Sequence, residues 1–104
     1  MIEVTNCRVY LNENEDDHLK AFASIILNDE FVVCDLKIIQ GNTKLFVAMP
    51  SRRRRDGIFR DVAHPIVRNL REHIENIVLE AYYREVADIA PGKVMVNSSE
   101  ISSV

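Results

Sequence analysis

Apolar and polar residues alternate along the first half of the chain. The clearest case is 19–27, where leucine, alanine and isoleucine recur at every second position, a period that places them on one face of a β-strand. Weaker alternation predicts further strands over 2–10, 31–39 and 44–49. The connections between the last three strands are short and contain Asn, Asp or Gly, which are the residues of tight turns. The pattern therefore predicts a four-stranded antiparallel meander.

The alternation also predicts which side chains share a face of the sheet. In strand 2–10, Ile2 and Val4 fall on one face and Cys7 and Val9 on the other. In strand 31–39, Asp35 and Lys37 fall on one face, and the opposite face carries Val32, Cys34, Leu36 and Ile38.

The apolar period changes to three and four after Pro65. Proline suits the first turn of a helix, so a helix is predicted to begin at or just after Pro65 and to run to about Val86. Its apolar stripe, predicted to pack on the sheet, consists of Ile66, Leu70, Ile74, Ile77, Val78, Ala81 and Tyr82. A short extended segment is predicted over 58–63. These elements predict an α+β fold, in which an antiparallel sheet of four to five strands is covered by a C-terminal amphipathic helix.

The length of 104 residues fits one domain, which the elements place at 1–90. Residues 91–104 begin with a proline and a glycine and contain four serines, so we expect a mobile or interface-forming tail, with 93–96 as a candidate short strand. A domain of this size buries roughly 65% of its extended surface and gains from subunit pairing. We therefore expect an oligomer.

The apolar runs and the number of cysteines disfavour several classes of protein. The longest apolar run, 45–49, is far shorter than the roughly 18 residues that span a bilayer, and no charged-then-apolar leader opens the chain. Cys7 and Cys34 are too few for a secreted disulfide scaffold. We expect a soluble cytoplasmic protein with no membrane partner.

Positive charge is concentrated in about a fifth of the chain. The formal net charge is −3, but residues 51–71 carry +5 and the remainder −8. All seven cations of this segment are arginine, whose planar guanidinium matches phosphate and guanine edges. This asymmetry is typical of a localised anion-binding face, although a solubilising loop is the simpler alternative. The candidate nucleic-acid-binding residues are Arg52, Arg53, Arg54, Arg55, Arg60, Arg68 and Arg71.

Candidate residues for other chemistry form weaker patterns. Ser51, Asp61 and His64 have the residue types of a hydrolytic triad, but His64 before Pro65 is better explained as ordering the turn into the helix, and Asp61 as pairing with Arg60 or capping local amides. His18, Cys7 and Cys34 lack metal-ligand spacing. His73 is expected on the helix surface. We predict no catalytic residue, metal, cofactor or small-molecule substrate.

The aromatic residues are few, and most occupy positions compatible with a core. They are Tyr10, Phe22, Phe31, Phe46, Phe59, Tyr82 and Tyr83. Readers of single-stranded RNA stack bases on exposed aromatic platforms, so a core placement argues against a reader of that kind. Tyr83 is the candidate for stacking or a dimer contact.

A long ordered string in the middle of the chain resembles the signature of the stage V sporulation protein G (SpoVG) family. It reads Phe-Val-Ala-Met-Pro-Ser over 46–51, Asp-Gly over 56–57 and Phe-Arg-Asp-Val-Ala-His-Pro-Ile over 59–66. Further likeness, at 4–5, 23–25 and 31–33, extends the resemblance over about residues 2–86.

The resemblance implies a small bacterial α+β protein that dimerises through its sheet, binds DNA and in some members RNA, and affects gene expression, septation and sporulation. It implies no catalysis. In this family the basic loop and the start of the following helix are thought to meet nucleic acid, which by position means Arg52 to Arg55, then Arg68 and Arg71.

The chain departs from the family at positions that bear on recognition. Members commonly carry Thr-Pro in place of Arg54 and Arg55, and glutamate in place of Ile58, and the helix start differs at 66–68. Phosphate affinity should survive these changes, but base preference is not carried over, because base-reading side chains lie among the altered ones. The alternative function is a septation or developmental factor that docks an acidic protein partner on the arginines.

Overall fold

The computed structural model describes residues 2–13 and 18–89. Six strands precede one helix: β1 (Val4–Leu11), β2 (Leu19–Leu27), β3 (Phe31–Gln40), β4 (Leu45–Ala48), β5 (Ser51–Arg53), β6 (Phe59–Asp61) and α1 (Arg68–Ile89). β1 to β4 form one antiparallel sheet in sequence order, and β5 and β6 form a separate two-stranded sheet. The predicted α+β fold and its four-stranded meander are confirmed. The predicted tail, 91–104, and the strand suggested at 93–96 lie outside the described residues.

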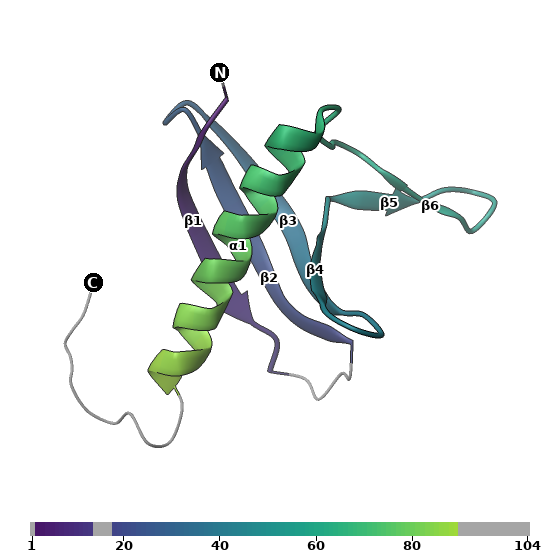
Figure 1. Ribbon diagram of the computed structural model, residues 1–104. Helices are drawn as coiled ribbons and strands as arrows, with labels where there is room; N and C mark the ends of the chain where they lie inside the picture. Colours follow the sequence, from purple (N-terminus) through teal and green to yellow (C-terminus); the bar gives the residue numbers. More distant parts are fainter. Residues whose placement is uncertain (1, 14–17, 90–104) are drawn as a thin grey trace.

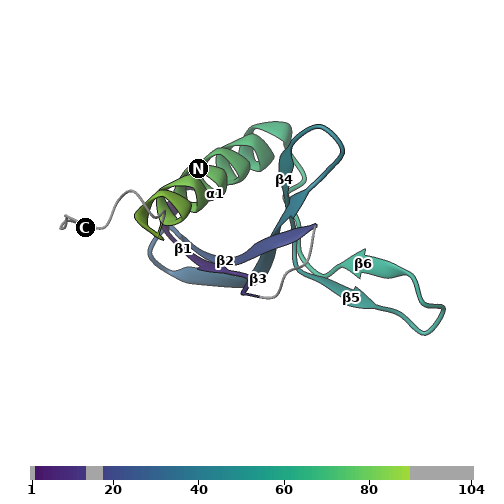
Figure 2. The same ribbon diagram turned by 90° about the horizontal axis from the view of Figure 1, so that it is seen from below.

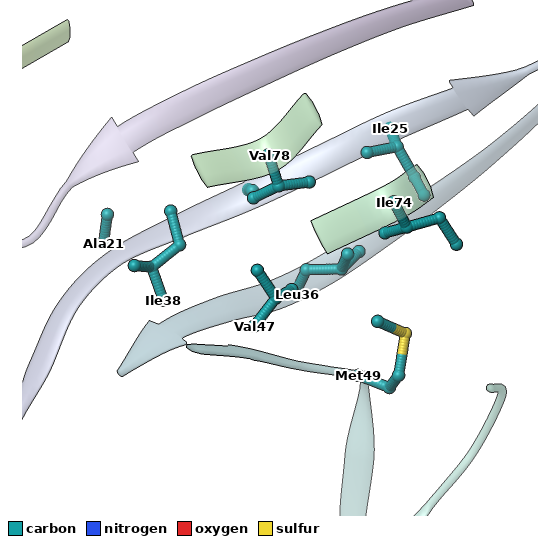
Figure 3. Close-up of a cluster of buried hydrophobic side chains, with 9 residues drawn as sticks. Ala21, Ile25, Leu36, Ile38, Val47, Met49, Ile74 and Val78 are labelled. Carbon is teal, nitrogen blue, oxygen red and sulfur yellow. The ribbon is translucent and has the colours of Figure 1, made fainter. Parts of the chain in front are cut away.

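The helix covers one face of the four-stranded sheet (Figures 1 and 2). α1 packs against β1, β2 and β4, and its Ile74 and Val78 meet side chains of β2 and β3 (Figure 3). From Ala21 to Leu27 every second residue of β2 points into this layer, as its alternation predicts. Leu19 is not among the packed side chains, and the register of β2 shifts between Leu19 and Ala21. The buried core is entirely aliphatic apart from a methionine: Ala21, Ala23, Ile25, Leu36, Ile38, Val47, Met49, Ile74 and Val78.

The pairing of the sheet shifts register at three places, and the shifts in β1 and β3 change the predicted facing of strand residues. An extra residue near Thr5 shifts the register of β1 between Val4 and Asn6, so Val4 and Cys7 both pack against the core. Their predicted placement on opposite faces is wrong, because a bulge lets the chain turn a further residue toward the same side.

The second bulge lies in β3, where Asp35 adopts a left-handed conformation with φ of 66°. The pairing with β2 shifts between Ala23 and Ile25, so that Val33 packs toward the core, whereas Val32 is 55% exposed and Cys34 is exposed. The predicted inward face of four residues is therefore correct for Leu36 and Ile38 and wrong for Val32 and Cys34.

The helix begins three residues later than Pro65. Its first backbone bond runs from the Arg71 N–H to the Val67 carbonyl oxygen, at 3.2 Å, so 65–67 form the connection into the helix. Ile66 consequently lies outside the helical stripe and is 89% exposed, contrary to its predicted place in the core. Of the rest of the predicted stripe, Leu70, Ile74, Val78 and Tyr82 pack inward. Ile77 and Ala81 are half-buried and are not among the side chains packed against the core.

Two side chains of α1 reach the outer strands of the sheet. The Val4 N–H of β1 donates to His73 Nε2 at 3.1 Å, and the Val47 N–H of β4 donates to a Glu75 carboxylate oxygen at 3.3 Å. His73 is thus half-buried and bonded, where a plain surface position is predicted. Exposed strand edges invite pairing with other chains, so these bonds satisfy one edge donor on each side.

Replacing His73 by alanine is expected to lower the free energy of unfolding by about 1 kcal/mol, because the Val4 N–H loses its acceptor. Asn76→Ala is the matched control, since Asn76 is exposed on the same helix and alanine brings a similar gain in helix propensity. Urea unfolding of both variants measures the difference. Equal stabilities would show that the bond contributes nothing.

Within residues 2–13 and 18–89, no helix is long and apolar enough to cross a membrane.

Candidate nucleic-acid interface

Most of the predicted arginines lie on a β-hairpin that projects from the body of the protein. We call this hairpin, residues 50–62, the arm. It leaves the sheet after β4 and extends away from the helix and from β1 to β3 (Figures 1 and 2). A bond from the Val62 N–H to the Pro50 carbonyl oxygen, at 2.7 Å, closes its base. The sequence order of strand, arginines, turn and strand therefore produces a hydrogen-bonded two-stranded ribbon in place of the expected loop.

The tip of the arm is a tight turn held by three hydrogen bonds. The Gly57 N–H donates to the Arg54 carbonyl oxygen at 2.9 Å, and the Arg54 N–H donates to the Ile58 carbonyl oxygen at 3.0 Å. Gly57 has φ of 86°, the left-handed conformation that follows a type I turn in a three-residue hairpin. The Asp56 carboxylate accepts the Ile58 N–H at 2.9 Å. The turn predicted at Asp56 and Gly57 is confirmed.

The register of the arm divides its side chains between two faces. Arg52 pairs directly with Arg60, and Arg53 pairs with Phe59. Because successive residues of a strand point to opposite faces, Arg52 and Arg60 share one face and Arg53 and Phe59 the other. β5 was not predicted from the sequence. A turn at 54–57 that is followed by an extended segment indicates a hairpin, and a hairpin requires a second strand before the turn.

The arm is cationic and its charge is not neutralised internally. It holds five arginines against Asp56 and Asp61. Across 2–13 and 18–89 the only ion pair joins Arg84 and Glu80, so the expected pairing of Asp61 with Arg60 is not observed. All arm residues from Arg52 to Asp61 are exposed, and Arg52 to Arg55 line an open depression.

The other two predicted arginines lie on the body. Arg68 and Arg71 are exposed in the first turns of α1, and residues 63–67 join this helix start to the arm. Free backbone N–H groups and the helix dipole make a helix N-terminus favourable for anions. No acidic residue occupies the first turn. The structure therefore brings five of the seven predicted arginines onto the arm and leaves two at the nearby helix start.

The residues of a possible hydrolytic triad lie near one another but are not assembled. Ser51 pairs with Asp61 across the arm, and Asp61 and His64 line one depression. His64 Nδ1 lies 3.1 Å from the Pro65 carbonyl oxygen, and among the described residues no hydrogen bond joins His64 to Ser51 or Asp61. A nucleophile of a hydrolytic triad bonds to its base, and these three residues do not form that hydrogen-bonded relay.

The cysteines and histidines do not assemble a metal site in the part of the chain that the structure describes. Cys7 and Cys34 are free thiols. Burial raises the pKa of the Cys7 thiol, and the nearby Arg84 charge partly opposes that shift. Because a thiolate is the form that binds metal or reacts, Cys7 is poorly suited to either role.

The aromatic side chains are mostly on the surface, which contradicts their predicted core placement. Exposed fractions are 56% for Tyr10, 65% for Phe31, 38% for Phe46, 62% for Phe59 and 58% for Tyr83. The core beneath the helix consists instead of aliphatic side chains and a methionine. Tyr83 makes an edge contact with Tyr82, with ring centroids 5.6 Å apart.

Three of these rings belong to the sheet face opposite the helix. Phe22 and Phe46 alternate with buried residues of β2 and β4, and Tyr10 pairs directly with Phe22. Ile39 joins them as the partner of Phe46. None of the described elements covers this face (Figure 2). We call it the open face. Because it carries exposed rings, the predicted lack of an aromatic platform on the sheet is wrong for this face.

An apolar cavity of about 210 Å³ lies between the sheet and the start of α1. Its walls include Phe31, Met49 and Leu70, and no arginine contributes to them. Phosphate requires charged or N–H donors, so the cavity does not extend the cationic site.

The fold and the arm define a class: a small α+β protein whose single helix backs an antiparallel sheet and whose arginines stand on a separate hairpin. The model of the SpoVG family matches residues 2–84, and the chain belongs to this family. Three similar proteins are each named "Putative septation protein SpoVG". The protein of Anaeromyxobacter sp. (strain Fw109-5) is 50% identical over 82% of this chain and 86% of its own.

The other two relatives come from different bacteria. The protein of Bdellovibrio bacteriovorus is 51% identical over 82% of this chain and 77% of its own length. The protein of Agathobacter rectalis is 46% identical over 85% of this chain and all of its own length. The similarity includes β5, β6 and the first turns of α1, so the arm belongs to the family region.

Proposed function

We propose that this protein is a nucleic-acid-binding regulator that acts in septation or sporulation. It binds DNA, with RNA as a second polymer to be tested, through the phosphate contacts of the arm and of the start of α1. The observation that carries the proposal is the group of five exposed arm arginines without an internal carboxylate partner. A fixed cationic ribbon on an otherwise acidic protein attracts a polyphosphate to one place.

The septation role rests on the names of the relatives, and the nucleic-acid role rests on the arm. The two are compatible, because a regulator of gene expression acts on cell division through the genes it controls. Direct action through an acidic protein partner is the competing proposal, since carboxylates also pair with arginine. The binding titration described next distinguishes nucleic-acid binding from binding of an acidic protein.

The test is the salt dependence of binding to labelled duplex DNA and to RNA. If about six phosphates are neutralised, the logarithm of the binding constant falls against the logarithm of the salt concentration with a slope of about −5. Fluorescence anisotropy at several salt concentrations measures this slope. A binding constant indifferent to salt contradicts phosphate recognition, and failure of both polymers to bind at low salt favours the protein partner.

We further propose that the protein is a homodimer that pairs through the open face of the sheet. Tyr10 and Phe46 are exposed there and Phe22 and Ile39 are half-buried, with Lys37 as the cross-strand partner of Phe22. A monomer would leave these apolar side chains in contact with water. The edges are less suitable, because β4 has only four residues and helix side chains bond one donor on β1 and one on β4. A second open face offers a matching surface, as two-fold symmetry requires.

Light scattering at micromolar concentration is expected to give about twice the chain mass of 11.9 kDa. Phe46→Asp should give a monomer, because two carboxylates would be buried at the interface without partners. Phe59→Asp is the matched control, since Phe59 is also exposed but lies on the arm. A monomeric wild type, or dissociation by the control alone, would contradict pairing through this face.

A further inference from the structure

The arm contains two arginines placed directly opposite each other. Arg52 and Arg60 are cross-strand partners, and such partners have Cβ atoms about 5 Å apart. Like charges in this position repel, yet no described carboxylate pairs with either side chain. The pair therefore presents hydrogen-bond donors without a described carboxylate partner, which a ligand with closely spaced acceptor atoms would stabilise.

The surroundings of this pair restrict what can approach it. Asp56, the acidic residue of the tip, is engaged with the Ile58 N–H. Asp61 pairs with Ser51 and so lies on the opposite face from Arg60. The Arg52–Arg60 face thus presents guanidinium groups in the middle of the ribbon, while Arg54 and Arg55 stand at the tip beyond it.

We infer that the arm enters the major groove of B-form DNA and that Arg52 and Arg60 contact guanines there. This inference rests on the proposed function and specifies the ligand of the same site. The major groove admits a two-stranded ribbon, and guanine presents its O6 and N7 acceptors in the groove to one arginine fork. Arg54 and Arg55 then contact backbone phosphates at the groove wall, which positions the ribbon without reading sequence.

The shape of the arm favours duplex DNA over duplex RNA. The major groove of A-form RNA is deep and too narrow for side chains to read, so a ribbon cannot enter it. The arm also extends away from the rest of the molecule (Figure 2), which lets its full width approach a groove without a clash between the sheet and the backbone of the duplex.

The test uses short mixed-sequence duplexes with altered guanines. Replacing guanine by 7-deazaguanine removes the N7 acceptor from the major groove, and replacing it by inosine removes only the minor-groove amino group. We expect 7-deazaguanine to weaken wild-type binding about tenfold, in line with the value of one bidentate contact, and inosine to leave it unchanged. The RNA duplex of the same sequence should bind more weakly than the DNA.

Two double variants that each lose two positive charges show which arginines contact guanine. Arg52→Ala with Arg60→Ala should abolish the sensitivity to 7-deazaguanine. Arg54→Ala with Arg55→Ala should keep that sensitivity while reducing the salt slope by about 2. All four side chains are exposed, so thermal unfolding should be unchanged in both variants.

The outcomes separate this inference from the proposed function. Salt-dependent binding that is insensitive to 7-deazaguanine, or sensitive to inosine instead, overturns groove insertion and leaves phosphate recognition intact. Equal binding of duplex RNA also overturns it. Absence of binding to any duplex or single strand at low salt rejects the proposed function together with the inference.

Discussion

Replacing Arg52, Arg53, Arg54 and Arg55 together by alanine is expected to weaken duplex DNA binding about a thousandfold near 0.1 M salt. Each phosphate contact releases a condensed counterion, so loss of the contacts of Arg53, Arg54 and Arg55 should also reduce the salt slope by about 2.7, and loss of the guanine contact of Arg52 should lower the affinity further. The fold should survive, because these side chains are exposed and the arm residues are absent from the core. Anisotropy titrations of both proteins over a salt series measure affinity and slope.

Two controls distinguish the arm from general charge. Arg84→Ala removes a cation from the body that already pairs with Glu80, and it should leave the affinity nearly unchanged. Lysine at all four arm positions keeps the charge but loses the planar fork, so it should preserve most of the slope and only part of the affinity. If the alanine variant binds as tightly as the wild type, the arm is not the binding site.

The order of the strands and the position of the helix can be predicted from the sequence, because the hydrophobic patterns that indicate them are local. Alternation in β2 and the three-and-four spacing of α1 each reflect one buried face, and the tight connections permit only antiparallel neighbours. The bulges at Thr5 and Asp35 do not follow, since a bulge depends on the register of the neighbouring strand. One extra residue then reverses the expected face, as at Cys34 and Val32.

The candidate site was predictable in its charge and less so in its shape. The sequence shows that the arginines are concentrated in 51–71. The pairing of Arg52 with Arg60 depends on the register that the turn at 54–57 sets, and that register is visible only in the structure. For the aromatic residues, the sequence predicts the wrong location. Their hydrophobicity predicts burial, whereas the core beneath α1 consists of aliphatic side chains and a methionine, and most of the rings lie on the surface.

A substitution in the centre of the core should have the largest effect on stability. Leu36 is fully buried and lies with Ile25 and Val78 between the sheet and the helix (Figure 3). Leu36→Ala is expected to lower the free energy of unfolding by about 3 kcal/mol, because apolar contacts are lost and a cavity remains. For a domain of this size the melting temperature should fall by roughly 15 °C, which calorimetry measures.

Ile66→Ala is the matched control for this prediction. The apolar spacing places Ile66 in the same stripe as Leu70 and Ile74, but the later helix start leaves Ile66 89% exposed. Its truncation should change the stability by less than about 0.5 kcal/mol, as for ordinary surface positions. A loss comparable with that of Leu36→Ala would mean that Ile66 is covered in solution, either by its own chain or by a second copy, and light scattering of the variant would distinguish these two cases.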